Sequence, residues 1–357
     1  MPKSQIISAS ITDGTIVNTD VANSTLTTTK LATPNLGRRN LIINGAMQIS
    51  QRGTSATGQG ASDLFLLDRF HLNTNGSSAG RYTVTQTADG PSGFANCMKL
   101  DCTTADIIIG SAERFFIEQR LEGQDLQQIK KGTSDAEQIT VSFYVKGNAS
   151  ATYVLGLYES DNSRAVGAQF SVTTSWTRVV VTFPADMTGA LDDDNQESLS
   201  LRWYLHAGSN YTSGTLATTW ASASASTQVG SGTTSFFDST DRTFFITGVQ
   251  MEVGSQATPF EHRSFGEELV LCQRYYQVVD ALMWGHQAKI GDTNRHVNWI
   301  LQPTMRATPA LTVSQVRSGF SFGGTNELAK DMANYYLSAG NTTDHVYGEN
   351  HIADAEL

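Results

Sequence analysis

The sequence predicts a mainly β protein, an antiparallel sandwich or barrel, and three observations support this fold class. Charged residues make up only 16% of the 357 residues, and 31 glycines accompany long runs of Ser and Thr; this composition is typical of strands and turns. Short segments that alternate large apolar with small or polar residues recur between residues 64 and 253. Gly, Asn, Asp and Ser separate these segments, as expected of turns between antiparallel strands.

The clearest expected strand is 138–147, which alternates in this way and ends at Gly147. One face of such a strand is expected to pack in a core. The other strands expected in the body are 64–72, 81–86, 152–158, 166–173, 176–183, 199–206 and 243–253. Residues 207–235 are rich in Gly, Ser, Thr and Ala, and we expect a long exposed loop or an extended excursion there.

One helix is expected after the last of these strands. Ser264 and Glu267 form a capping-box pattern, and helix-forming residues continue to about Gln277, acidic first and basic later. Beyond the helix, strand-like segments occur at 296–301 and 310–316. The sequence therefore predicts a sandwich over 37–263, followed over 264–357 by a helix and a small β-rich C-terminal domain.

The first 36 residues form a different kind of segment. Large aliphatic residues recur at every fifth position in polar surroundings; they are Ile6, Ile11, Ile16, Val21, Leu26 and Leu31. A period of five matches neither a helix nor a strand, and six apolar side chains do not offset the entropy of ordering such a segment. We interpret residues 1–36 as an extended arm that packs against identical chains or a larger partner. The alternative is a disordered polar tail with accidental spacing.

Charge and cysteine content exclude several classes of protein. The formal net charge is −10 and no basic stripe occurs, which argues against nucleic-acid binding and attraction to an anionic membrane. No run of 18 apolar residues and no secretory signal is present, so we expect no membrane insertion and no export. Cys97, Cys102 and Cys272 are odd in number, as is typical of thiols made in a reducing cytosol. Cys97 and Cys102 are expected on opposite strand faces, which excludes a disulfide between them.

Several segments resemble tail-fibre proteins of tailed bacteriophages. The resemblance runs from about residue 40 to 310 and is most specific over 250–276. It rests on 40–53 (NLIINGAMQISQRG), 68–70 (DRF), 248–254 (GVQMEVG), 257–264 (ATPFEHRS), 268–269, 272–276 (CQRYY) and 305–309 (MRATP). The resemblance implies a virion component, trimeric as most fibres are, that is attached by its N-terminus and presents a distal domain to the host.

A second resemblance concerns the strands alone. Residues 141–147, 176–183 and 244–252 are similar to strands of jelly-roll carbohydrate-binding modules. This similarity implies that the antiparallel sandwich is a jelly roll.

Aromatic residues near the long loop are the candidates for glycan binding. A pyranose ring stacks on an aromatic face flanked by polar groups that bind its hydroxyls. The candidates are Trp203, Tyr204, Tyr211 and Trp220. Tyr211 and Trp220 are preferred because a polar loop offers them little else to bury against, and the alternative for each is a packed aromatic. Trp176 is expected in the core.

No cofactor, metal site or catalytic activity is expected. Residues 192–194 are three consecutive aspartates, but they lack the glycine and the ligand spacing of a calcium loop, so a solvated hairpin tip is the better interpretation. The sequence contains no nucleophile elbow, zinc-protease motif or phosphate-binding loop.

These observations lead to one hypothesis and two alternatives. The hypothesis is a structural virion protein, a homotrimeric tail fibre assembled in the bacterial cytoplasm. Its arm binds a tail or neck protein, its jelly-roll body forms the shaft or knob, and its loop aromatics or C-terminal region bind host surface glycan. The first alternative is a capsid decoration (cement) protein with the arm between capsid subunits. The second is a polysaccharide depolymerase with two carboxylates from distant strands.

Overall fold

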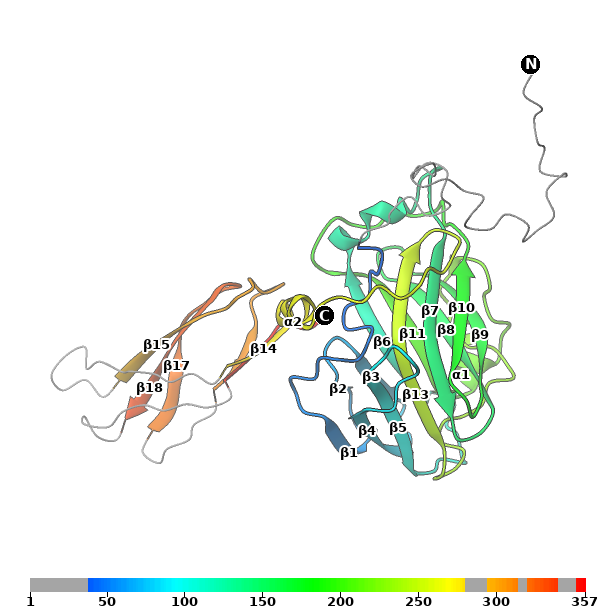
Figure 1. The fold of residues 1–357 in the computed structure, drawn as a ribbon, viewed down its shortest axis with the longest axis horizontal. Helices are drawn as coiled ribbons and strands as arrows, with labels where there is room; N and C mark the ends of the chain where they lie inside the picture. Colours follow the sequence, from blue (N-terminus) through cyan, green and yellow to red (C-terminus); the bar gives the residue numbers. More distant parts are fainter. Residues whose placement is uncertain (1–37, 280–293, 314–319, 340–350) are drawn as a thin grey trace, which may run out of the picture.

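The computed structural model describes residues 38–279, 294–313, 320–339 and 351–357, so the predicted arm lies outside the described residues. The body is an antiparallel jelly-roll β-sandwich, as the sequence predicts (Figure 1). The six-stranded sheet contains, in spatial order, β1 (Ser55–Gln59), β4 (Arg81–Thr87), β5 (Cys97–Thr104), β13 (Thr243–Val253), β7 (Ile139–Gly147) and β10 (Thr177–Phe183). The seven-stranded sheet contains β12 (Ala221–Ser222), β9 (Arg164–Val172), β8 (Ala151–Glu159), β11 (Glu197–Ala207), β6 (Arg114–Glu122), β3 (His71–Asn75) and β2 (Leu64–Phe65).

The strand alternation places one face of each sheet in a shared core. Phe143 on β7 and Trp203 on β11 are fully buried and meet edge to face across the two sheets, with their ring centroids 5.7 Å apart. Burial of one large apolar side chain stabilises the fold by about 1.5–3 kcal/mol. Cys97 and Cys102 are free thiols, and only Cys102 belongs to this core, as expected for opposite faces of β5.

The long loop covers part of the outer face of the seven-stranded sheet. It contains α1 (Ser209–Thr212) and the 3₁₀ turn η6 (Ala225–Thr227). Phe116, Val154, Tyr204 and Val229 form a second apolar cluster beneath it. Two glycines paired across β8 and β9 make room for this layer, because a Cβ on Gly167 would lie 2.8 Å from Leu216. The inner side of the loop therefore packs on the sheet, while its outer side is exposed, for example at Ser213, Thr215 and Thr218.

The helix α2 (Phe265–Gln273) begins with the predicted capping box. The Ser264 amide donates to Glu267 Oε2 over 3.0 Å, and the Glu267 amide donates to Ser264 Oγ over 3.3 Å. The helix ends four residues before the expected Gln277, because Tyr276 to Val279 form β14 and pair with β19 (His351–Asp354). No helix among the described residues is long and apolar enough to cross a membrane.

Two three-stranded sheets follow α2 in the described C-terminal residues (Figure 1). One contains β14 (Tyr276–Val279), β19 (His351–Asp354) and β16 (Ala310–Thr312), and the other contains β15 (Asn294–Ile300), β18 (Met332–Ala339) and β17 (Phe320–Leu328). Ion pairs join this region to the body, among them Arg274 with Glu122 and Arg69 with Glu356. The predicted domain boundaries at 37 and 264 stay predictions.

Candidate functional site

Two of the predicted glycan-binding residues are buried, so neither has a ring face on which a sugar could stack. Trp203 is fully buried in the sandwich core, so its prediction is wrong: its position in β11 alternates inward. Tyr204 points to the opposite face, but the long loop covers it and leaves it 4% exposed. Strand parity, not nearness to the loop, decides where these two rings lie.

Tyr211 and Trp220 are half-buried, and each ring already has neighbours. The guanidinium of Arg114 lies 5.1 Å from the centroid of Tyr211. Trp220 donates its Nε1 hydrogen to the Pro184 carbonyl over 2.9 Å, and Lys131 Nζ lies 5.6 Å from its ring centroid. Their role in glycan binding stays a prediction.

The space beneath the long loop is too small for a sugar. A cavity of about 10 Å³ lies there, lined by residues that include Gly156, Tyr158, Tyr204 and Gln228. A volume of about 10–15 Å³ accommodates one water molecule. Any sugar on this sheet therefore has to bind on the part of its outer face that the loop leaves uncovered.

A row of residues crosses the outer face of the sheet beside the loop; Gly156 in this row also lines the cavity beneath the loop, and Glu118 and His71 are buried. It joins five neighbouring strands in direct register; its members are Gly156 (β8), Arg202 (β11), Glu118 (β6), His71 (β3) and Phe65 (β2). We call these residues the charged row. Their sequence neighbours Leu155, Trp203 and Ile117 are in the core, so the row lies on the outer face.

Glu118 is the centre of the charged row. Its carboxylate lies 2.9 Å from Arg202 Nε, 2.7 Å from Arg120 Nη2 and 2.9 Å from His71 Nδ1. Burial alone raises the pKa of this carboxyl, but the His71 hydrogen bond and the two arginines outweigh burial and lower the pKa to about 2. Glu118 is therefore ionised throughout the physiological range, and it fixes both guanidinium groups.

An aromatic ring flanks this charged centre. The guanidinium of Arg202 lies 4.4 Å from the centroid of the half-buried Tyr158. Tyr158, Ser200 and Arg120 form the next row in register, and Glu197 approaches Arg120 Nε to 3.3 Å. Hydrogen-bond donors and acceptors with fixed positions therefore lie beside one aromatic side chain, a combination that suits recognition of sugar hydroxyls.

Sequence reasoning missed these residues although part of the signal was present. Strand β6 was not among the expected strands, yet Glu118, Arg120 and Glu122 alternate with Ile117 and Leu121 in it. The buried amide of Gln119 interrupts that apolar alternation and hydrogen-bonds the backbone of Ile43 over 2.8 Å. The register that aligns β6 with β3 and β11 depends on long-range pairing.

Comparisons with known proteins yield similar folds. No family model and no curated protein matches the chain. The enzymatically active domain of tailspike protein 4 from bacteriophage CBA120 is similar over 60% of this chain, with 11% identity and a TM-score of 0.32. This chain spans only 21% of that domain.

Carbohydrate-binding modules are also among the similar structures. The family 11 module of Clostridium thermocellum, solved with a mixed-linked tetrasaccharide, matches over 57% of this chain and 98% of its own, with 11% identity and a TM-score of 0.29. Tandem family 22 modules from Paenibacillus barcinonensis cover 90% of this chain and 91% of their own, again with 11% identity and a TM-score of 0.29. At such low identity the similarity concerns the fold alone.

Proposed function

We propose that this protein is an adhesive virion component that binds glycan through the half-buried Tyr158 and Arg120 on the outer face of its seven-stranded sheet. The observation that carries the proposal is the row of Tyr158, Ser200 and Arg120, in which the buried Glu118 holds the Arg120 guanidinium in place. Fixed donors and acceptors next to an aromatic face match the hydroxyls and the apolar face of a pyranose.

Features of the sequence support the proposed location in a virion. The resemblance of residues 40–310 to tail-fibre proteins and the period-five arm support a homotrimeric tail fibre, assembled in the bacterial cytoplasm and attached by residues 1–36 to a tail or neck protein. Host surface glycan is then the ligand, and binding needs no chemical step.

A glycan array tests the adhesive part of the proposal. The purified full chain is applied to printed bacterial capsular polysaccharides and lipopolysaccharides. Tyr158→Ala and Arg120→Gln each remove a group of the proposed face, and we expect each to weaken binding about tenfold, which corresponds to about 1.4 kcal/mol. Absence of binding by the unaltered chain to every polysaccharide would refute the proposal.

Trp220→Ala is the matched aromatic control, because Trp220 is a half-buried ring outside the charged row. We expect its glycan binding to equal that of the unaltered chain. If Trp220→Ala or Tyr211→Ala weakens binding and Tyr158→Ala does not, the long loop carries the site. New reducing ends after incubation with a bound polysaccharide would reveal a depolymerase instead.

Particles assembled in the presence of a chain that lacks residues 1–36 test the virion part of the proposal. We expect the truncated chain to fold and to be absent from particles. Incorporation at full copy number would contradict anchoring by the arm, and a mass in solution equal to one chain would contradict the trimer.

A further inference from the structure

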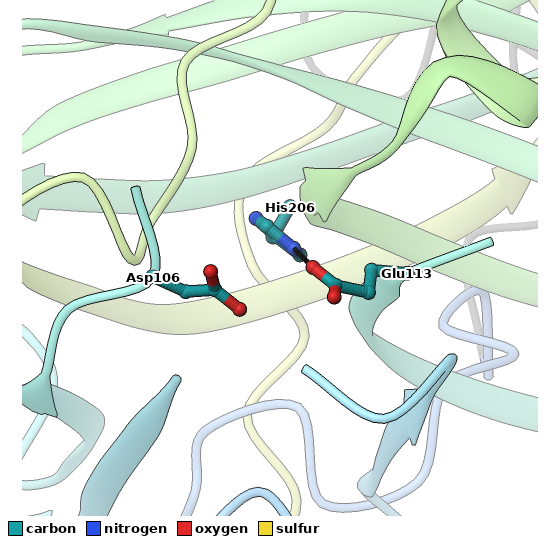
Figure 2. A group of neighbouring side chains, drawn as sticks. All are labelled: Asp106, Glu113 and His206. Atoms are coloured by element: carbon teal, nitrogen blue, oxygen red, sulfur yellow. Dashed lines mark hydrogen bonds and ion pairs between the residues drawn. The ribbon is translucent and has the colours of Figure 1, made fainter. Parts of the chain in front are cut away.

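Three side chains of metal-ligand type meet at one end of the sandwich. Asp106 lies in the segment that crosses from β5 in one sheet to β6 in the other, Glu113 directly precedes β6, and His206 lies near the end of β11. One ligand atom from each lies within 4.8 Å of the other two, and all three residues are buried. Figure 2 shows these side chains pointing toward one another, with His206 Nε2 3.4 Å from Glu113 Oε2.

The carboxylates of this group differ from the other buried carboxylates in their partners. Nine Asp and Glu residues are buried in the described part of the chain. Seven of them form an ion pair with Arg or Lys; they are Asp68, Glu118, Glu122, Glu159, Asp186, Glu252 and Glu268. Asp106 and Glu113 form no ion pair with Arg or Lys among the described residues, and their basic neighbour is His206. Two buried carboxylates side by side without a permanent cation are costly.

The imidazole of His206 is held in place from its other side. His206 Nδ1 lies 2.8 Å from Ser235 Oγ, which also accepts the Phe237 amide hydrogen over 3.0 Å. An imidazole that donates its Nδ1 hydrogen to Ser235 directs the Nε2 lone pair at Glu113, and metal-bound histidines are oriented in this way.

Hydrogen bonds and close packing position the two carboxylates. Asp106 Oδ2 accepts hydrogen bonds from Ser78 Oγ and the Ala79 amide, each over 2.8 Å. Glu113 faces Gly110, where an added Cβ would lie 2.7 Å from Glu113 Oε1, so a glycine keeps the space beside this oxygen open. The side chain of Glu113 retains 10% exposure.

We propose that Asp106, Glu113 and His206 bind one divalent transition-metal ion of the Zn²⁺ class. One imidazole nitrogen and two carboxylate oxygens are the donor set that such ions accept, with solvent completing the coordination, whereas Ca²⁺ prefers oxygen ligands alone. The ion supplies the positive charge that arginine and lysine supply elsewhere in the protein. The ion stabilises the segment that connects β5 in one sheet to β6 in the other. This segment contains the exposed Ile107, Ile108 and Ile109.

Titration of the full chain with metal tests the proposal. The protein, with any affinity tag removed, is dialysed against EDTA and then against chelator-free buffer, and ZnCl₂, MnCl₂ and CaCl₂ are titrated in a calorimeter. We expect one Zn²⁺ per chain with a dissociation constant in the micromolar range or below, weaker binding of Mn²⁺, and no binding of Ca²⁺. Absence of zinc binding by the unaltered chain would overturn the proposal.

Matched variants locate the ion. Glu113→Gln and His206→Gln each remove one ligand, and we expect each to weaken zinc binding at least tenfold. His71→Gln is the control, because His71 is also buried between carboxylates but lies beside two arginines; its zinc binding is expected to equal that of the unaltered chain. Equal zinc binding by all three variants would place the ion elsewhere and overturn the assignment.

Thermal unfolding keeps the test decisive if His206→Gln fails to fold. Glu113→Gln keeps the side-chain shape and removes one negative charge. In EDTA we expect its unfolding temperature to equal or exceed that of the unaltered chain; in excess Zn²⁺ only the unaltered chain gains a few degrees. A loss of the same size with and without zinc would mean that the three residues form a simple hydrogen-bonded cluster.

Discussion

His71 and His206, both buried in the described part of the chain, face carboxylates but differ in what balances the negative charge. His71 lies 2.9 Å from Glu118 and 3.4 Å from Asp63, whereas His206 lies 3.4 Å from Glu113. In the charged row, Arg120 and Arg202 bind Glu118. No arginine or lysine forms an ion pair with Asp106 or Glu113 among the described residues.

The positive charge beside Glu118 is therefore permanent, whereas the positive charge proposed beside Asp106 and Glu113 is exchangeable. A guanidinium stays charged at every physiological pH and cannot leave, so the charged row is complete as folded. A metal ion can be removed, and its carboxylates then repel each other. The same residue types therefore give a fixed polar surface at one place and a metal-dependent fastening at the other.

Neutralising each central carboxylate gives the largest expected contrast. Glu118→Gln leaves Arg120 and Arg202 without their buried partner, and we expect it to lower the free energy of unfolding by about 3 kcal/mol. Glu113→Gln in EDTA removes a repulsion instead, and we expect no loss. Urea unfolding at pH 7 in EDTA measures both. Equal losses in the two variants would mean that the arginines do not distinguish the two sites.

The pH dependence of stability sharpens the same contrast. The pKa of Glu118 falls from its ordinary value of 4.5 to about 2 in the folded protein. Its contribution is therefore complete above about pH 4.5 and is lost as the pH falls toward 2. We expect the stability difference between the unaltered chain and Glu118→Gln to shrink over that interval in urea unfolding. A difference that stays constant down to pH 2.5 would show that Glu118 stabilises by packing and not by charge.

The sequence was sufficient for the fold class and for local signals. Alternation in 138–147 predicted β7, and the Ser264 and Glu267 pattern predicted the start of α2, because both signals lie within a few neighbouring residues. The predicted end of α2 was wrong because Gln277 belongs to strand β14. Its partner in the sheet, Ala353, lies 76 residues later in the sequence.

The candidate sites were beyond sequence reasoning for a related reason. Asp106, Glu113 and His206 have no metal-binding spacing, since they converge only after β5, β6 and β11 take their places in the two sheets. Trp203 and Tyr204 were chosen for nearness to the loop, but strand parity placed one of them in the core. Parity could have excluded Trp203, whereas the metal-ligand geometry required the tertiary structure.

Ser235→Ala tests whether the orientation of the His206 ring contributes to zinc binding at the proposed metal site. The change removes the oxygen that holds His206 Nδ1 and leaves all three proposed ligands in place. Loss of such a supporting contact typically weakens metal binding about 10–100-fold. We expect the zinc affinity measured in the calorimeter to fall about tenfold, the lower end of that range. An unchanged zinc affinity would show that the ring is oriented by packing against Phe237, whose ring centroid lies 5.2 Å away.

Asp63→Asn removes the charge of the exposed carboxylate beside His71 of the charged row and should have the smallest effect. The side chain of Asp63 is 47% exposed, and exposed ion pairs contribute about 0–1 kcal/mol. An asparagine oxygen can still accept the hydrogen bond that the Thr74 amide donates over 2.9 Å. We expect urea unfolding to show a change below about 0.5 kcal/mol. A loss approaching that of Glu118→Gln would mean that His71 depends on both carboxylates, and that the two arginines alone do not account for the stability of the charged row.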